Sequence, residues 1–122
     1  MIEFKNFNYK YIGSEKLNIE NLSLNIKKGE CVLFTGRSGC GKTTILRVLN
    51  GLAPEFFNGG FSGGLKVAHL KIGDRLKEFS KVVGSVFQNP KNQFFNLDST
   101  SELAFSMENY GYPREDITKR IK

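Results

Sequence analysis

The fold of this chain is decided by the stretch Gly36-Arg37-Ser38-Gly39-Cys40-Gly41-Lys42-Thr43. It matches the pattern of a glycine, four residues and Gly-Lys-Thr without a mismatch. The preceding residues 30–35 are largely apolar and predict a short buried strand. The following residues 42–50 predict a helix that ends at Gly51. A strand, a glycine-rich loop and a helix in this order predict an α/β fold built around a phosphate-binding loop.

The composition of this loop suits phosphate groups. Glycine lets the backbone turn tightly and point its N–H groups inward, because no Cβ atom stands in the way. The helix that follows presents free N–H groups and a partial positive charge. We expect Lys42 to reach the terminal phosphates, and Thr43 to place its hydroxyl on a bridging Mg²⁺. A glycine-rich turn that binds nothing explains the register of these residues poorly.

Length, composition and charge limit the other possibilities. The chain has 122 residues, of which 39% are apolar, so one globular domain is expected. No apolar run approaches a membrane span and no signal layout opens the chain, which predicts an intracellular protein. The net charge is +6, but basic residues are scattered, so nucleic-acid binding is not expected. Cys31 is predicted to lie in the buried strand, and the two cysteines suggest neither zinc nor a disulfide.

The pattern of apolar residues predicts several further elements. The aromatic residues of 7–11 and the leucines of 22–26 predict an antiparallel pair of strands that leads into the buried strand. The remaining expected elements are a glycine loop over 58–64, short strands at 65–67 and 70–72, and a second core strand over 82–87. Ser99 and Glu102 predict a capped helix that ends at Gly111, and Pro113 predicts the start of another helix.

Together these segments resemble a known family. An aromatic strand, the turn Lys27-Lys28-Gly29-Glu30, the glycine loop and a core strand ending in Gln88 look like the nucleotide-binding subunit of ATP-binding-cassette (ABC) transporters. A more specific resemblance joins the chain to the ATPase subunits of energy-coupling-factor importers, which take up vitamins or transition-metal ions. It rests on Val83-Gly84-Ser85-Val86-Phe87-Gln88-Asn89-Pro90, Gln93-Phe94-Phe95, Glu102-Leu103-Ala104-Phe105 and Glu108-Asn109.

The resemblance covers essentially the whole chain and implies a fold and a site. The fold would be a P-loop NTPase-like core with an N-terminal antiparallel β segment, residues 1–122 forming the first half of an ABC ATPase domain. The cofactors would be ATP and Mg²⁺. Lys42 and Gln88 would be catalytic, with Thr43 and Gln88 on the metal. The residues expected to contact the nucleotide are Tyr11, Gly36, Arg37, Ser38, Gly39, Cys40, Gly41, Lys42, Thr43 and Thr44.

Tyr11 matches the aromatic residue that stacks on the adenine ring in this family. Such stacking uses the π-face of the ring, so it adds affinity more than selectivity. Tyr11 could equally be an ordinary aromatic residue of the core or of a hairpin, and Tyr9 is the competing candidate for the stacking role.

The partners implied by the resemblance are a second ATPase subunit and a transmembrane subunit at the inner face of the cell membrane.

The sequence also departs from the family. The signature Leu-Ser-Gly-Gly-Gln and the apolar strand ending in paired acids are absent, and residues 61–65 match the signature only superficially. His69 precedes Gln88, so it is expected to be a surface or strand-edge residue. A truncated module that binds nucleotide or a partner without turnover is therefore the alternative function. A GTPase or small-molecule kinase is a third, although the strings Asp-x-x-Gly and Asn-Lys-x-Asp do not occur.

Overall fold

The computed structural model describes residues 1–88 and 97–121, and the chain divides into two compact units, Met1–Ser85 and Val86–Lys122. The first unit contains strands β1 (Ile2–Tyr11), β2 (Ile19–Ile26), β3 (Gly59–Val67) and β4 (Leu70–Lys71), and helices α1 (Lys42–Leu49), α2 (Leu52–Glu55) and α3 (Leu76–Val82). The described residues of the second unit form helices α4 (Ser99–Asn109) and α5 (Arg114–Ile121).

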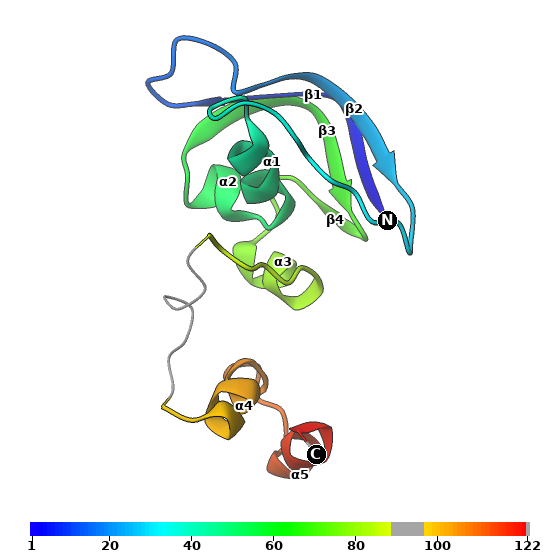
Figure 1. The fold of residues 1–122 in the computed structure, drawn as a ribbon, viewed down its shortest axis with the longest axis vertical. Helices are drawn as coiled ribbons and strands as arrows, with labels where there is room; N and C mark the ends of the chain where they lie inside the picture. Colours follow the sequence, from blue (N-terminus) through cyan, green and yellow to red (C-terminus); the bar gives the residue numbers. More distant parts are fainter. Residues whose placement is uncertain (89–96, 122) are drawn as a thin grey trace. The chain divides into compact units, whose positions relative to one another are not determined.

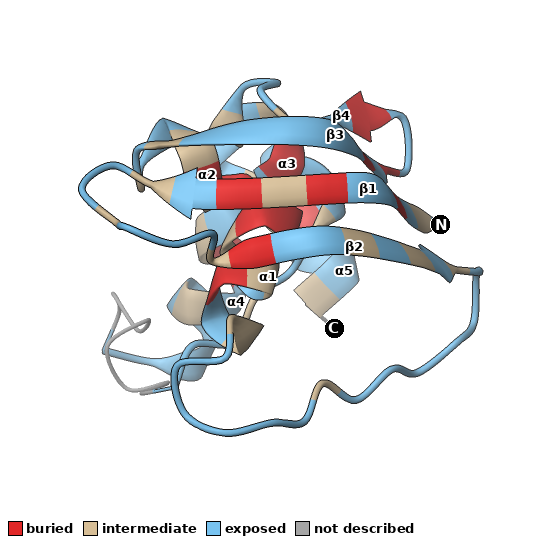
Figure 2. Cartoon of the chain, turned by 90° about the horizontal axis from the view of Figure 1, so that it is seen from above, coloured by how far each residue is buried: buried red, intermediate tan, exposed pale blue. Residues whose placement is uncertain are grey.

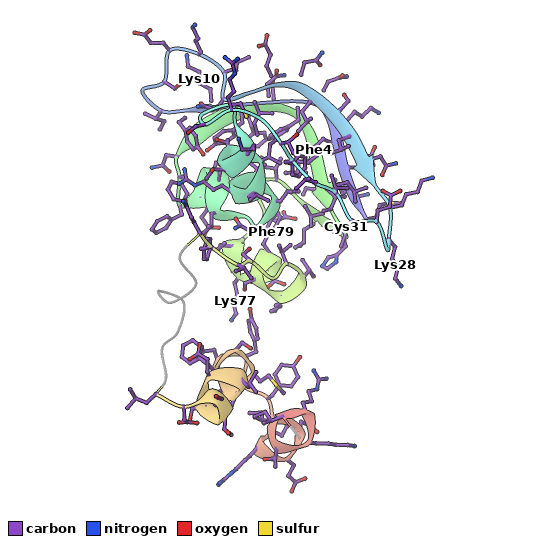
Figure 3. The ribbon with its side chains drawn as sticks, viewed as in Figure 1. Phe4, Lys10, Lys28, Cys31, Lys77 and Phe79 are labelled. Atoms are coloured by element: carbon purple, nitrogen blue, oxygen red, sulfur yellow. The ribbon has the colours of Figure 1, made fainter. Side chains whose placement is uncertain are left out.

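The first unit is an antiparallel sheet with helices packed on one face. The strands lie in the order β2-β1-β3-β4, and α1 and α2 cover the concave face of the sheet (Figure 1). Buried residues recur along β1, which lies between two neighbours (Figure 2). Phe4 of β1 and Phe79 of α3 belong to one apolar core that also includes Val48 of α1 (Figure 3). The predicted antiparallel pair of strands is confirmed, and the α/β class with it.

A bulge in β1 explains why its aromatic residues share one face. Phe4 and Phe7 are three residues apart, so a regular strand would point them to opposite faces. The register with β2 shifts between these two residues, the register with β3 shifts between Lys5 and Asn8, and Asn6 adopts a φ of 46°. The extra residue returns Phe7 to the buried side, where Tyr9 also lies. One aromatic face therefore forms in spite of the irregular spacing.

The predicted glycine loop over 58–64 is wrong, because most of it is the first half of β3. A Cβ on Gly59 would lie 2.4 Å from the carbonyl oxygen of Lys10, in the facing strand. A Cβ on Gly63 would lie 2.1 Å from the carbonyl oxygen of Asn6, and Gly63 has a φ of +79°. These glycines allow close approach to β1 and accommodate its bulge, rather than marking a turn. The predicted short strands that follow are confirmed as the end of β3 and as β4.

The two predicted core strands are also wrong. Residues 30–35 form an exposed connection between β2 and α1; Cys31 lies on it, and Lys28 lies in the turn that precedes it (Figure 3). Residues 83–87 follow α3 without regular structure. Leu33 is 84% exposed and Val86 is 83% exposed. A buried strand needs a neighbour for its backbone hydrogen bonds, and no strand of the described residues pairs with either segment. Cys31 is accordingly exposed, not buried.

The predicted helices of the second unit are confirmed, with one correction at the start of α4. The N-cap is Asp98, whose carboxylate accepts the backbone N–H of Ser101 at 2.9 Å, so the predicted cap at Ser99 is wrong. Gly111 ends the helix as expected. Its N–H donates to the carbonyl of Glu108 and the N–H of Tyr112 donates to that of Met107, which is the Schellman arrangement.

Replacing Gly63 with alanine tests the close packing of β3 against β1. The new Cβ would collide with backbone that cannot move independently of the sheet, and the residue would keep a φ that disfavours side chains. We expect Gly63→Ala to lower the free energy of unfolding by about 2 kcal/mol or more, measured by equilibrium denaturation. The matched control is Gly60→Ala, since a Cβ at Gly60 meets nothing within 4 Å. Equal stability of the two variants would contradict this account of β3.

The cap of α4 predicts a dependence on pH. The backbone N–H of Ser101, and then its hydroxyl, lower the pKa of Asp98 by hydrogen bonding to the carboxylate. The cap therefore stabilises α4 fully above the ordinary pKa of aspartate, and the contribution is lost as pH falls through the lowered folded value. We expect Asp98→Ala to reduce helical circular dichroism at pH 7, and to have a progressively smaller effect as pH falls through the lowered pKa of Asp98. A loss that stays the same size as the carboxylate is protonated would refute this role.

Candidate functional site

The loop that joins the exposed connection to α1 needs its glycines for steric reasons. A Cβ on Gly36 would lie 2.6 Å from Sγ of Cys40, across the loop. A Cβ on Gly41 would lie 2.6 Å from the carbonyl oxygen of Asn18, and Gly41 has a φ of +103°. Gly39 has open space around it but a φ of +81°. The loop therefore keeps its backbone exposed and closely curved only with glycine at these positions.

Lys42 turns its ammonium group back into the loop that precedes it. Nζ donates to the carbonyl oxygen of Gly36 and, at 2.9 Å, to that of Arg37, and it lies 3.6 Å from Sγ of Cys40. Arg37 and Ser38 are exposed on the same loop. The nine residues 36–44 contain two cationic side chains and no carboxylate. A positive charge thus lies at the centre of a backbone loop, as phosphate binding requires.

The first turn of α1 adds backbone donors to this charge. The first hydrogen bond of the helix joins the N–H of Ile45 to the carbonyl of Gly41. The N–H groups of Lys42, Thr43 and Thr44 precede it and have no partner within the helix. These donors and the positive end of the helix lie directly after the loop. Loop and helix together form an anion-binding arrangement, and the residues present fit the phosphates of a nucleotide.

The two threonines that end the motif have different surroundings. Thr43 is exposed, so its hydroxyl is accessible to a metal ion. Thr44 is 6% exposed, and its hydroxyl oxygen accepts the hydroxyl of Tyr11 at 3.0 Å. The side chain of Thr44 therefore anchors α1 to β1, and its backbone N–H, in the first turn of α1, is the group left for the candidate site. Its predicted place among the nucleotide contacts stays a prediction.

Tyr11 lies at the end of β1, beside α1. Its ring packs edge-on against that of Tyr9 with centroids 5.2 Å apart, and its N–H donates to Oδ1 of Asn18 at 3.0 Å. Burial raises the pKa of Tyr9, and the proximity of Tyr11 adds to this effect. The Tyr9 hydroxyl remains a donor, to the carbonyl of Phe57 at 2.5 Å. Of the two competing aromatics, Tyr9 is wholly buried and Tyr11 is partly accessible.

Two residues that contact the loop or belong to α1, Asn18 and Arg47, were not predicted from the sequence. Asn18 contacts Gly41 through its carbonyl oxygen and Tyr11 through its side chain. Arg47 lies over the ring of Phe57, with its guanidinium carbon 3.8 Å from the ring centroid. The sequence contained one signal that could have pointed to Arg47, its helical spacing. Arg47 lies three residues after the buried Thr44, so the two residues share one face of the helix.

Gln88 is described as an exposed residue of the second unit. Its predicted contacts with Mg²⁺ and the attacking water stay predictions, and so do the catalytic roles of Lys42 and Gln88. The segments Asn89-Pro90 and Gln93-Phe94-Phe95, which the resemblance also used, lie outside the described residues. His69 is exposed, in the turn between β3 and β4, as expected.

Comparison with known proteins identifies the family to which this chain belongs. The sequence model of the ABC transporter family matches residues 19–120. This match covers most of the chain, so the protein belongs to the ABC transporter family.

Curated relatives from several organisms agree with this assignment. A putative ABC transporter ATP-binding protein of Treponema denticola is 45% identical over 100% of this chain and 25% of its own length. One of Pyrococcus abyssi is 42% identical, over 100% of this chain and 44% of its own. An energy-coupling factor transporter ATP-binding protein of Ligilactobacillus salivarius is 38% identical, over 99% and 42%. The chain thus spans less than half the length of these relatives.

A solved structure supports the fold. It is the dimeric, post-hydrolysis state of an ATP-binding cassette bound to ADP and phosphate. The similarity has a TM-score of 0.70 at 26% sequence identity, and it covers 99% of this chain and 54% of that one. The fold predicted from the sequence, the N-terminal part of an ABC ATPase domain, is therefore confirmed.

The different surroundings of Thr43 and Thr44 give a matched pair of variants. Replacing the exposed hydroxyl in Thr43→Val should weaken the dependence of ATP binding on Mg²⁺ and leave stability unchanged. Thr44→Val should remove the acceptor of the Tyr11 hydroxyl and lower the free energy of unfolding by about 1 kcal/mol. Isothermal titration of ATP with and without Mg²⁺, together with equilibrium denaturation, measures both effects. The assignment is wrong if the two variants exchange these behaviours.

Proposed function

We propose that this chain binds ATP with Mg²⁺ as the nucleotide-binding part of an ABC-type importer. Binding and hydrolysis of the nucleotide would drive the uptake of a solute across a membrane. The observation that carries the proposal is the geometry of the loop, in which the Lys42 ammonium lies among backbone carbonyls and α1 presents its N-terminus. An arrangement of this kind binds adjacent phosphates by charge and by backbone donors.

Each part of the ligand has a candidate partner in the chain. Lys42 exchanges the loop carbonyls for the terminal phosphates, because the charge-assisted bond to phosphate is stronger. The backbone of residues 36–44 surrounds the phosphates, and Thr43 carries the Mg²⁺ ligand. Tyr11 provides the aromatic surface for the base, since it is partly accessible and lies beside α1, whereas the competing Tyr9 is buried. The family resemblance assigns Gln88 to the metal ion and the attacking water, a role that suits a neutral side-chain amide.

The class of importer is proposed from sequence similarity. Residues 83–90 match the ATPase subunits of energy-coupling-factor importers, and the relative from Ligilactobacillus salivarius carries that description. The solute would accordingly be a vitamin or a transition-metal ion. In the described residues, no helix has the length and apolar character needed to cross a bilayer. The resemblance also implies a separate transmembrane subunit that would carry the solute, with this chain on the cytoplasmic face of the membrane.

A second ATPase subunit is the other proposed partner. The structural relative is described as dimeric and in a post-hydrolysis state. In the proposed dimer, the loop of one subunit would face the partner subunit across the nucleotide. The competing function is a module that binds nucleotide without turnover, and measurement of Mg²⁺-dependent phosphate release separates the two functions.

Replacing Lys42 tests the proposed function directly. Lys42→Ala removes the charge at the centre of the loop, and we expect Mg²⁺-ATP affinity to fall by at least about tenfold. The measurement is a titration with a fluorescent ATP analogue and competition by unlabelled ATP. Lys77→Ala is the control for loss of one positive charge, because Lys77 is an exposed residue of α3 (Figure 3).

Circular dichroism of both variants verifies that the fold is retained. The proposal fails if the unmodified chain shows no affinity for ATP. It also fails if Lys42→Ala and Lys77→Ala bind ATP as the unmodified chain does.

A further inference from the structure

Arg47 has surroundings that are unusual for an arginine. It is half-buried on α1, and its guanidinium carbon lies 3.8 Å from the ring centroid of Phe57 and 5.9 Å from that of Tyr11. No carboxylate pairs with it among residues 1–88 and 97–121. Its charge is thus balanced by the negative faces of two aromatic rings, which hold a guanidinium in place.

A chain of hydrogen bonds connects Arg47 to the start of the same helix. Nη1 of Arg47 donates to the Tyr11 hydroxyl at 3.2 Å, and this hydroxyl donates to Oγ1 of Thr44 at 3.0 Å. Arg47 and Thr44 lie one turn apart on α1. The end of the Tyr11 ring is therefore held at two points by the helix whose first turn follows the phosphate loop.

The backbone of Tyr11 and a neighbouring aromatic ring also fix its position. Its N–H donates to Asn18, whose carbonyl oxygen also lies against Gly41 of the loop. The ring of Tyr9 packs on its edge. The position of the Tyr11 ring relative to the loop is consequently set by α1, by the turn between β1 and β2, and by β1 itself.

We propose that Arg47 is a positioning residue for the base-binding end of the nucleotide site. It holds the Tyr11 ring at a fixed place relative to Lys42 and the phosphate loop. This inference rests on the proposed nucleotide-binding function and adds a residue to it. A nucleotide must satisfy both ends of the site at once, so a fixed separation reduces the entropy lost on binding.

An arginine suits this role better than a lysine. The planar guanidinium stacks on Phe57 and donates to the Tyr11 hydroxyl with the same group. An ammonium group keeps the charge but lacks the flat surface, so it does not make both contacts in one geometry. Arg47→Lys should therefore leave the Tyr11 ring less firmly held in position, without changing the net charge of the chain.

Two ligands distinguish positioning of the base-binding end from a general effect on the fold. Mg²⁺-ATP uses the whole site, whereas inorganic tripolyphosphate with Mg²⁺ uses only the phosphate loop. We expect Arg47→Lys to weaken ATP binding by at least about fivefold, since stacking of one base contributes a larger factor than this. Tripolyphosphate affinity should change by less than about twofold, because α1 and the loop stay in place. Isothermal titration measures both.

Tyr11→Phe is the second variant, and it keeps the aromatic ring but removes the hydroxyl that Arg47 and Thr44 hold. The expected result is the same selective loss of ATP affinity. This variant therefore tests the role of the Tyr11 position even if Arg47→Lys does not fold.

Arg75→Lys is the matched control, because Arg75 is an exposed arginine at the start of α3. This variant should bind both ligands as the unmodified chain does.

Three results overturn the inference. Equal losses for ATP and tripolyphosphate would show that Arg47 acts through the fold as a whole. Normal ATP binding by Tyr11→Phe together with weak binding by Arg47→Lys would show that Arg47 contacts the nucleotide itself. If the unmodified chain binds neither ligand, the proposed function fails and this inference fails with it.

Discussion

The contact between α1 and the aromatic face of β1 is the constraint on which the candidate site depends. The buried Val48 of α1 packs in the same core as Phe7 and Tyr9 of β1. At the start of the helix, Thr44 accepts the hydroxyl of Tyr11, and Gly41 lies against the carbonyl of Asn18. These contacts fix the N-terminus of α1, and so they determine where the phosphate loop presents its donors.

The sheet provides the rigid surface for this contact. Its aromatic face exists only because β1 bulges at Asn6, and the bulge is tolerated only because Gly63 of β3 lies opposite. A local irregularity in one strand is thus matched by a glycine in its neighbour. The glycines of β3 support the phosphate loop indirectly, although they are distant from it in the sequence.

Local chemistry made part of this structure predictable. The loop from Gly36, the start of α1 at Lys42 and the end of α4 at Gly111 follow from short-range rules for glycine and helix termini, and all three were predicted. The strand character of the first half of β3 was missed because a glycine that allows close approach to another strand looks the same in sequence as a glycine in a turn.

Residues 30–35 and 82–87 were predicted as strands for a different reason. Their apolar composition indicates burial, but whether such a segment is a strand depends on a neighbour that its own sequence does not specify. Arg47 was missed because its role depends on Tyr11 and Phe57, which are distant in the sequence. The contacts of the loop backbone could be predicted from local rules, whereas the side chains that hold the helix in place could not.

The central claim is that the loop and the first turn of α1 bind the phosphates of a nucleotide. Amide chemical shifts of the whole chain, followed by NMR during titration with Mg²⁺-ATP, test it most directly. We expect the largest shifts at the backbone amides of residues 36–44, with smaller shifts at Tyr11 and Asn18. Shifts that leave residues 36–44 unchanged, or that concentrate in α4 and α5, would contradict the account.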